Sequence, residues 1–309
     1  MKTPSLSFFF ATTAAIALIV WMARGAMAPS APPNNELPLS AADSLYNEAQ
    51  GLRGVHLMSG LDLRTDFESS MAQNDIRSAV EFAFGFIHST IGTGALNDAA
   101  IFIDQLQGAQ NSPLVLRSLG SCGVGYLKIK KGSTVDALQD LTICIEYFAS
   151  NRQLYPHIYG HALHLMALLF HEQGLYDKSL EYYNLALEFR KQGTTDSQID
   201  RAATLNNIGN IYWKIGLFSR ALSYHERALL FKQNVLPPEH ADISASLNNI
   251  GNVLNDIGEF ESALEFHKTA YEQRLNSLGN HSSTAHSLHN ISESLFHLDR
   301  HQESIEIMK

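Results

Sequence analysis

The chain has 309 residues, of which 45% are hydrophobic, so it can bury a large core. Its net charge is −9, from 31 acidic and 22 basic residues, and it has no basic stripe with interleaved aromatic side chains, so nucleic acid is not expected as a partner. It also lacks a nucleophile elbow, a phosphate loop, a dinucleotide fingerprint, a zinc-protease helix and the kinase motifs. We therefore expect neither an enzyme nor a cofactor.

The amino terminus has the pattern of an export signal or a membrane anchor. Lys2 precedes an apolar run over residues 6–23, and Arg24 ends it. This order is typical of a secretory signal, and the run is also close to the ~20 residues that span a bilayer. Residues 1–28 are therefore predicted to be a signal peptide or a single membrane anchor. Either outcome leaves the rest exported (periplasmic or secreted) or anchored to the membrane by residues 6–23.

A linker and a helical region follow. Residues 29–40 hold four of the nine prolines and are predicted to form an extended linker. Residues 41–112 are predicted to be a helical N-terminal region, with apolar residues at helical spacing over 66–89 and a short helix over 95–107. This region is expected to cap the part of the chain that comes next.

From residue 113 onwards a pattern recurs with a period of about 42 residues: a glycine is followed five positions later by a small residue. A period in this range indicates a repeat array, here of helix–turn–helix units. Ala95 lies one full period before Ala137, so a degenerate extra repeat within 41–112 is an alternative, although no glycine marks its expected turn. The last unit stops inside its second helix, which favours a fragment. The glycine and small-residue pairs are Gly132–Ala137, Gly174–Ser179, Gly216–Ala221 and Gly258–Ala263. The predicted units are 113–152, 155–196, 197–238, 239–280 and the incomplete 281–309.

Both cysteines fall in one unit. Cys122 and Cys144 stand on the two helices of a predicted hairpin, about equally far from the turn at Gly132. A disulfide is conceivable in an oxidising compartment. The alternative is a pair of small core residues, because Cys144 occupies the place where other units have alanine.

The amino-acid sequences of the later units identify the repeat type. LNNIGNIYWKIGLFSRALSYHERAL (205–229) and LNNIGNVLNDIGEFESALEFHKTA (247–270) resemble tetratricopeptide repeats of the kinesin light chain type. The resemblance is closest over 199–309, weaker over 113–198 and absent over 1–110. It implies an all-α fold, a right-handed α-solenoid of antiparallel helix pairs, whose concave groove is the usual peptide site.

The helical period predicts which side chains line that groove. Residues opposite the packed stripe, at about 100° per residue, are mostly asparagines, whose amides can pair with both the N–H and the C=O of an extended peptide. The alternative is that Asn207 and Asn249 brace neighbouring helices by hydrogen bonds. The predicted groove residues are Asn206, Asn207, Asn210, Trp213, Asn248, Asn249, Asn252, Asn255, Asn290 and Phe296.

A histidine stripe extends this surface upstream. His161, His164 and His171 lie one repeat period before Ala203, Asn206 and Trp213 and should therefore face the same groove. Their close helical spacing also permits a metal site, but groove-lining side chains are the preferred interpretation, and no metal is predicted. Binding at this stripe would depend on pH between about 5 and 8.

These features predict a protein–protein interaction scaffold that binds an extended peptide segment, neutral or mildly basic, in the concave groove. The alternative is a regulatory or sensor array of a larger enzyme or signalling protein, whose effector domain would lie beyond residue 309. A third hypothesis is a self-assembling module. The sequence does not specify the ligand or the oligomeric state.

Overall fold

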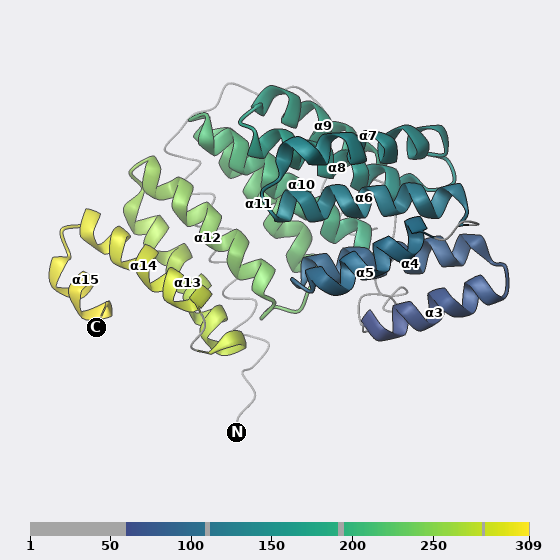
Figure 1. Ribbon diagram of the computed structural model, residues 1–309. Helices are drawn as coiled ribbons and strands as arrows, with labels where there is room; N and C mark the ends of the chain where they lie inside the picture. Colours follow the sequence, from purple (N-terminus) through teal and green to yellow (C-terminus); the bar gives the residue numbers. More distant parts are fainter. Residues whose placement is uncertain (1–59, 109–111, 191–194, 280–281, 309) are drawn as a thin grey trace. The chain divides into compact units, whose positions relative to one another are not determined.

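The computed structural model describes residues 60–108, 112–190, 195–279 and 282–308, and every element in these ranges is a helix (Figure 1). The predicted fold class is confirmed: these helices form an all-α solenoid of helix pairs. The predictions for residues 1–28 and 29–40 lie outside the described residues. The helices are α3 (Gly60–Ala72), α4 (Ile76–Gly92), α5 (Leu96–Gly108), α6 (Leu114–Lys130), α7 (Thr134–Ser150), α8 (Pro156–Glu172), α9 (Tyr176–Phe189), α10 (Thr195–Lys214), α11 (Phe218–Val235), α12 (Ala241–Asp256), α13 (Phe260–Leu278), α14 (Ser282–His297) and α15 (His301–Ile307).

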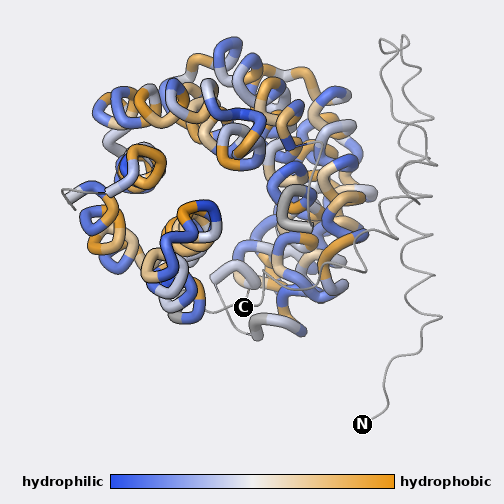
Figure 2. The backbone as a smooth tube through the Cα atoms, turned by 90° about the vertical axis from the view of Figure 1, so that its right-hand side faces the viewer, coloured by the Kyte–Doolittle hydropathy of each residue, from blue (hydrophilic) through white to orange (hydrophobic). Residues whose placement is uncertain are grey.

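The helices group into two compact units, which we call the N-terminal unit (residues 60–216) and the C-terminal unit (residues 217–308). Each has its own apolar core. Figure 2 shows apolar and polar stretches alternating along the helices, as amphipathic helices require. In the N-terminal unit the largest fully buried side chains include Phe102, Leu116, Leu141, Phe148 and Tyr183. In the C-terminal unit the core includes Leu247, Ile250, Phe266 and Ile291.

The turn inside each repeat is built as the sequence predicts. Gly132 has φ +78°, and Gly174, Gly216 and Gly258 are also left-handed. This conformation lets the last carbonyls of the first helix accept bonds from the turn, as in Ser133 N–H to Lys128 O at 2.8 Å. Glycine adopts it without the steric cost that other residues incur.

The small residue five positions after each turn lets the two helices approach closely. Ala137, Ser179, Ala221 and Ala263 are all completely buried. The approach is close enough that the partner position on the first helix is often glycine. A Cβ at Gly125 would lie 2.6 Å from a methyl carbon of Leu141, and one at Gly251 would lie 2.5 Å from His267 Cε1.

The N-terminal helical region differs from the sequence prediction in its boundaries. The helical spacing over 66–89 is present, but the helix is interrupted at Asn74, which has φ +58°. Asp75 then caps α4 by accepting a bond from Ser78 N–H at 3.2 Å. Asparagine tolerates the left-handed region, and aspartate is a strong N-cap, so the two residues together end one helix and start another.

This region has a turn glycine that the repeat period did not reveal. Gly94 is left-handed, with φ +85°, and stands five positions before the completely buried Ala99. The pair repeats the pattern of Gly132 and Ala137, but at a distance shorter than one full period. A search at fixed period misses it, because α5 has 13 residues whereas the corresponding helix α7 has 17.

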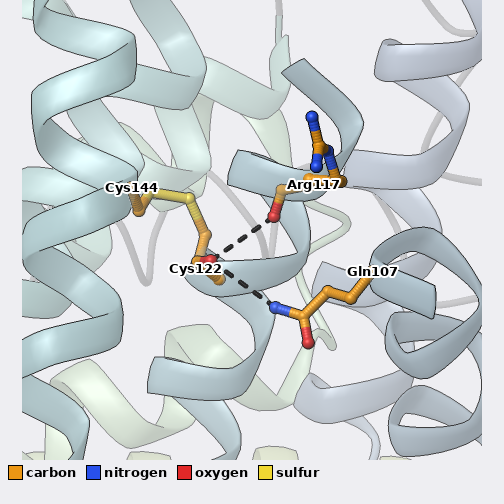
Figure 3. Close-up of a disulfide and its surroundings, with 5 residues drawn as sticks. Gln107, Arg117, Cys122 and Cys144 are labelled. Carbon is orange, nitrogen blue, oxygen red and sulfur yellow. Dashed lines mark hydrogen bonds between the residues drawn. A yellow bond between two sulfur atoms is a disulfide. The ribbon is translucent and has the colours of Figure 1, made fainter. Parts of the chain in front are cut away.

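The two cysteines form a disulfide that joins α6 to α7 (Figure 3), and their Cα atoms are 5.2 Å apart. Cys144 is completely buried in the alanine position of its repeat, and Cys122 is 4% exposed. The bond therefore links the two helices of the hairpin within their buried interface. A cross-link across a separation of 22 residues stabilises the fold by about 3 kcal/mol in the chain-entropy model.

The close approach of α12 and α13 in the C-terminal unit predicts that a single added methyl group lowers stability. Gly251→Ala should lower the free energy of unfolding by about 1–3 kcal/mol, because the new Cβ overlaps the buried His267 ring. Denaturant unfolding followed by circular dichroism measures the change. The matched control is Gly92→Ala, a helical glycine with no atom within 4 Å of the added Cβ. A Gly251→Ala variant as stable as the control would contradict the packing described.

Candidate peptide-binding site

The predicted asparagine ladder exists in the C-terminal unit, and it joins helices to each other. Asn290 Nδ2 on α14 donates to Asn248 Oδ1 at 2.8 Å and to Asn252 Oδ1 at 3.1 Å on α12. Ser294 Oγ donates to Asn255 Oδ1 at 3.0 Å. Asn248 and Asn290 are each only 5% exposed. Their amides are therefore engaged between α12 and α14, where a bound peptide would have to compete with these bonds.

In the C-terminal unit, Asn248, Asn252 and Asn290 make interhelix bonds of the kind that the sequence offered as an alternative for Asn207 and Asn249. Neighbouring positions on a helix differ by only about 100°, so periodicity does not distinguish Asn248 from Asn249. Asn249 itself is half-buried, as are Asn252 and Asn255. Only the packing of α14 beside α12 decides which amide lies between the two helices.

Beyond this brace, α14 carries an exposed stripe. His286, His289, Glu293 and Phe296 follow one another at intervals of three and four positions, and all four are exposed. We call these residues the α14 stripe. The Phe296 side chain is 59% exposed, with its ring 4.9 Å from the ring of His301. An accessible aromatic ring beside titratable and acidic groups is suited to contact with a partner.

In the N-terminal unit the predicted groove residues of α10 are intermediate in exposure. Asn206, Asn207, Asn210 and Trp213 are all half-buried. The Lys214 ammonium lies 5.6 Å from the centre of the Trp213 ring. These side chains therefore keep part of their surface accessible, and they stay candidates for the site.

The three histidines of the predicted stripe lie in different surroundings. His161 is 6% exposed, and its Nδ1 lies 3.3 Å from Arg190 Nη2. His164 Nδ1 lies 3.2 Å from Arg190 Nη1 and 3.0 Å from Thr204 Oγ1. His171 is separate, half-buried, with Nδ1 3.6 Å from a Glu172 carboxylate oxygen. Two of the three histidines thus belong to a buried polar network.

Arg190 is the centre of that network. Its guanidinium donates to the hydroxyl of Thr204 and to the carbonyl of Asp200 at 2.8 Å, and it lies 3.6 Å from the Asp200 carboxylate. Arg190 is 3% exposed. Burial lowers the pKa of His161 and His164 well below 6.5, and the charge of Arg190 adds to this effect in both.

Arg190 is the first of three buried cations spaced by the repeat period, a pattern that the sequence reasoning missed. Each stands near the end of the second helix of a repeat and bonds the first helix of the next one. Lys232 Nζ donates to Ser246 Oγ at 2.9 Å and to Asp242 O at 3.1 Å. Arg274 Nη1 donates to Ser287 Oγ at 2.7 Å and to Ser283 O at 2.9 Å. The signal was the recurrence of Arg190, Lys232 and Arg274.

The described residues form no metal centre, and the cavity beside the histidines is small. No group of three or more His, Cys, Asp or Glu side chains among them is placed to hold a metal ion. A cavity of about 10 Å³, lined by Phe84, His88, Tyr126 and His161 among others, is no larger than a water molecule requires. This cavity is therefore too small for a small-molecule substrate.

Comparison with known proteins agrees with this picture. Residues 159–234, 200–275 and 242–309 each match the tetratricopeptide repeat family. Residues 159–309 belong to this family. The tetratricopeptide repeats expected from the sequence are confirmed by this match. Arrays of this family are interaction scaffolds, and no catalytic family is indicated. No curated protein sequence matches the chain.

Solved structures show the same fold at low sequence identity. The nearly identical TPR-like repeats of a Podosopora anserina protein described as a kinesin light chain superpose with a TM-score of 0.54 at 18% identity, covering 64% of this chain and 94% of that one. BtubC (BKLC) from P. vanneervenii gives 0.54 at 19%, covering 80% and 94%. NprR, in complex with its cognate peptide NprX, gives 0.56 at 15%, covering 87% and 76%.

The repeated cations predict a loss of stability when one is removed. Arg274→Met should lower the free energy of unfolding by about 1–3 kcal/mol, because it leaves the Ser287 hydroxyl and the Ser283 carbonyl without their buried donor. Urea unfolding of the C-terminal unit within the full chain measures the change. Arg227→Met on α11, an exposed arginine beside Tyr224, is the control and should stay within about 0.5 kcal/mol of wild type. Equal effects of the two substitutions would argue against the interhelix bond.

The burial of His267 predicts that the stability of the protein depends on pH. Burial lowers its pKa to about 4, with smaller effects from Arg274 and His286. The unfolded chain takes up this proton near pH 6.5, so stability is complete above about pH 6.5 and falls as the pH drops towards 4. His267→Leu should reduce this slope by about 1.4 kcal/mol per pH unit. Leucine already fills the matching position opposite Gly125, as Leu141.

Chemical unfolding at pH 7, 6 and 5 measures the slope for wild type and variant. The control is His289→Leu on the exposed α14 stripe. Its free energy of unfolding should change with pH as that of wild type does. If His267→Leu and wild type lose the same free energy of unfolding as the pH is lowered, the buried neutral imidazole does not cause the pH dependence.

Proposed function

We propose that this scaffold binds an extended segment of a partner protein, and that the α14 stripe with the accessible side of α12 forms part of the binding surface. The observation that carries the proposal is the difference in exposure on these two helices. Asn248 and Asn290 are buried between the helices, whereas Asn249 is half-buried and Phe296 is 59% exposed. A family scaffold with an exposed aromatic ring is suited to anchor a peptide.

The chemistry of the surface favours a neutral or mildly basic segment. Glu293 on α14 and Asp256 at the end of α12 are both exposed. The half-buried amide of Asn252 can offer its Nδ2 donor to a peptide backbone, because only its Oδ1 is used by Asn290 in the brace. The peptide in the NprR complex supports the proposal only through the shared fold, because the two chains are 15% identical.

Selection from a random peptide library on the full chain tests this function. Peptides that bind wild type should bind the double variant Asn249→Ala with Phe296→Ala at least about tenfold more weakly, since anchor truncations of this kind cost about 1.4 kcal/mol or more. Fluorescence anisotropy measures the affinity, and circular dichroism checks that the variant is folded. The control is Leu230→Ala, an exposed apolar residue on α11. Selected peptides that bind the double variant as tightly as wild type would refute the proposed surface.

We further propose that the protein works outside the reducing cytosol. Two observations support this: the bond between Cys122 and Cys144, which is typical of oxidising compartments, and the apolar run over 6–23 behind Lys2. No helix in the described ranges is long and apolar enough to cross a membrane, and residues 6–23 lie outside those ranges.

A reporter fusion tests the location. Residues 1–40 placed before alkaline phosphatase, which is active only after export to an oxidising compartment, should give enzyme activity in a bacterial host. Removing residues 6–23 should abolish it. An inactive fusion that is expressed at normal levels would contradict export by this segment.

A further inference from the structure

Helices of the N-terminal unit bring their polar side chains together around one aromatic ring. The Phe84 ring of α4 lies 5.2 Å from the His161 ring and 5.5 Å from the His157 ring, both on α8. The His88 ring, also on α4, lies 4.9 Å from that of His161. We call His88, His157, His161 and His164, together with Arg190 at the end of α9, the histidine cluster.

Helix α4 is joined to α8 and α10 across this cluster. Glu81 Oε2 on α4 lies 2.8 Å from His157 Nε2 on α8. His88 Nε2 on α4 lies 3.9 Å from an Asp200 carboxylate oxygen on α10. Together with Phe84, these contacts place α4 over the face of α8 that carries His161, which is why His161 is 6% exposed. The sequence predicted this same face to be open to a ligand.

The hydrogen bonds require neutral imidazoles. A guanidinium only donates, and it keeps its proton in proteins. Arg190 Nη2 lies 3.3 Å from His161 Nδ1, and Arg190 Nη1 lies 3.2 Å from His164 Nδ1. Both Nδ1 atoms must therefore accept, so neither can carry a proton while α4 covers the face. Protonation of either ring would replace an acceptor by a second cation facing Arg190.

We propose that α4 is an acid-released cover over the face of α8 that bears His161 and His164. At neutral pH the uncharged rings pack under Phe84 and accept from Arg190. On acidification the rings take up protons, the buried positive charges repel one another, and α4 leaves so that water can reach them. In combination with the proposed function, which this regulatory role presupposes, release would expose the face of α8 as a further polar surface of the N-terminal unit for a peptide segment.

The charges around the two rings support this direction. The groups that face them are Glu81 and His88 on α4, Tyr126 on α6, His157 on α8, Tyr183 and Arg190 on or next to α9, and Asp200 on α10. The Asp200 carboxylate already lies within ion-pair distance of both Arg190 and His88. Glu81 is partly exposed and paired with His157, so water screens its effect. Added protons would therefore have to share negative charge that is already paired.

The sign of the pH effect follows from linkage. Burial, with the charge of Arg190, holds the pKa of both rings well below 6.5 while α4 is in place. Once α4 leaves and water reaches the rings, they take up protons near pH 6.5. The released state binds more protons, so its population rises as the pH falls below about 6.5.

Hydrogen–deuterium exchange of the full chain at pH 7.5 and pH 5.0, corrected for intrinsic exchange rates, tests the cover without any ligand. Protection of α4 should fall at least about tenfold at pH 5.0, while far-UV circular dichroism and the protection of α7, which lies in the same unit and outside the cluster, are retained. Unchanged protection of α4 would overturn the proposal. Because no peptide is used, this result is independent of whether the protein binds one.

A matched pair of variants assigns the effect. In His161→Gln with His164→Gln, amide oxygens can still accept from Arg190 but do not titrate, so α4 should stay protected at both pH values. His171→Gln on the same helix, outside the cluster, should respond as wild type. A double variant that loses α4 protection at pH 5.0 would refute the role of the two rings.

Should the double variant fail to fold, NMR titration of the wild-type histidine Cε1–H signals provides the test. The signals of His161 and His164 should shift together with the loss of α4 protection. Titration of the two rings while α4 stays protected would refute the mechanism.

Discussion

The close approach of two helices within each repeat is the constraint on which the remaining structure depends. At Gly132, Gly174, Gly216 and Gly258 a left-handed glycine reverses the chain within a short turn, and a completely buried small residue five positions later brings the helices together. Where the approach is closest, the opposing position is glycine, as at Gly125 against Leu141 and Gly251 against His267. The same requirement explains why Cys144 could replace alanine and form a disulfide: the position faces Cys122 with a Cα separation of 5.2 Å.

Polar contacts then determine how one helix pair lies on the next. Apolar packing is tolerant of small shifts, whereas a buried cation needs its acceptors at defined places. Arg190, Lys232 and Arg274 meet this need with a hydroxyl and a backbone carbonyl each, always on the following helix. In the first repeat the corresponding residue is Phe148, which is completely buried. The array therefore uses apolar contact at this position in the first repeat and hydrogen bonds from buried cations in the later ones.

Because these polar side chains bond neighbouring helices, less of the surface is available to a partner. Asn248 and Asn290 brace two helices, and His161 and His164 accept from Arg190 beneath α4. What stays accessible is the α14 stripe, with half-buried amides on α10 and α12. A polar residue on the expected face of a helix is therefore not by itself evidence of a ligand contact, because the neighbouring helix can use the same hydrogen-bonding groups.

The sequence by itself determined the repeat period, the turns and the helix pairs, because these depend on local chemistry that recurs in every unit. It did not reveal the break at Asn74, the turn at Gly94, or the role of the three buried cations. The tertiary structure alone decided which of two adjacent asparagines lies between helices and that α4 covers His161. The physical reason is that burial is set by neighbours distant in the chain: the helical period orients a side chain towards a face, and only packing determines whether another helix already occupies that face.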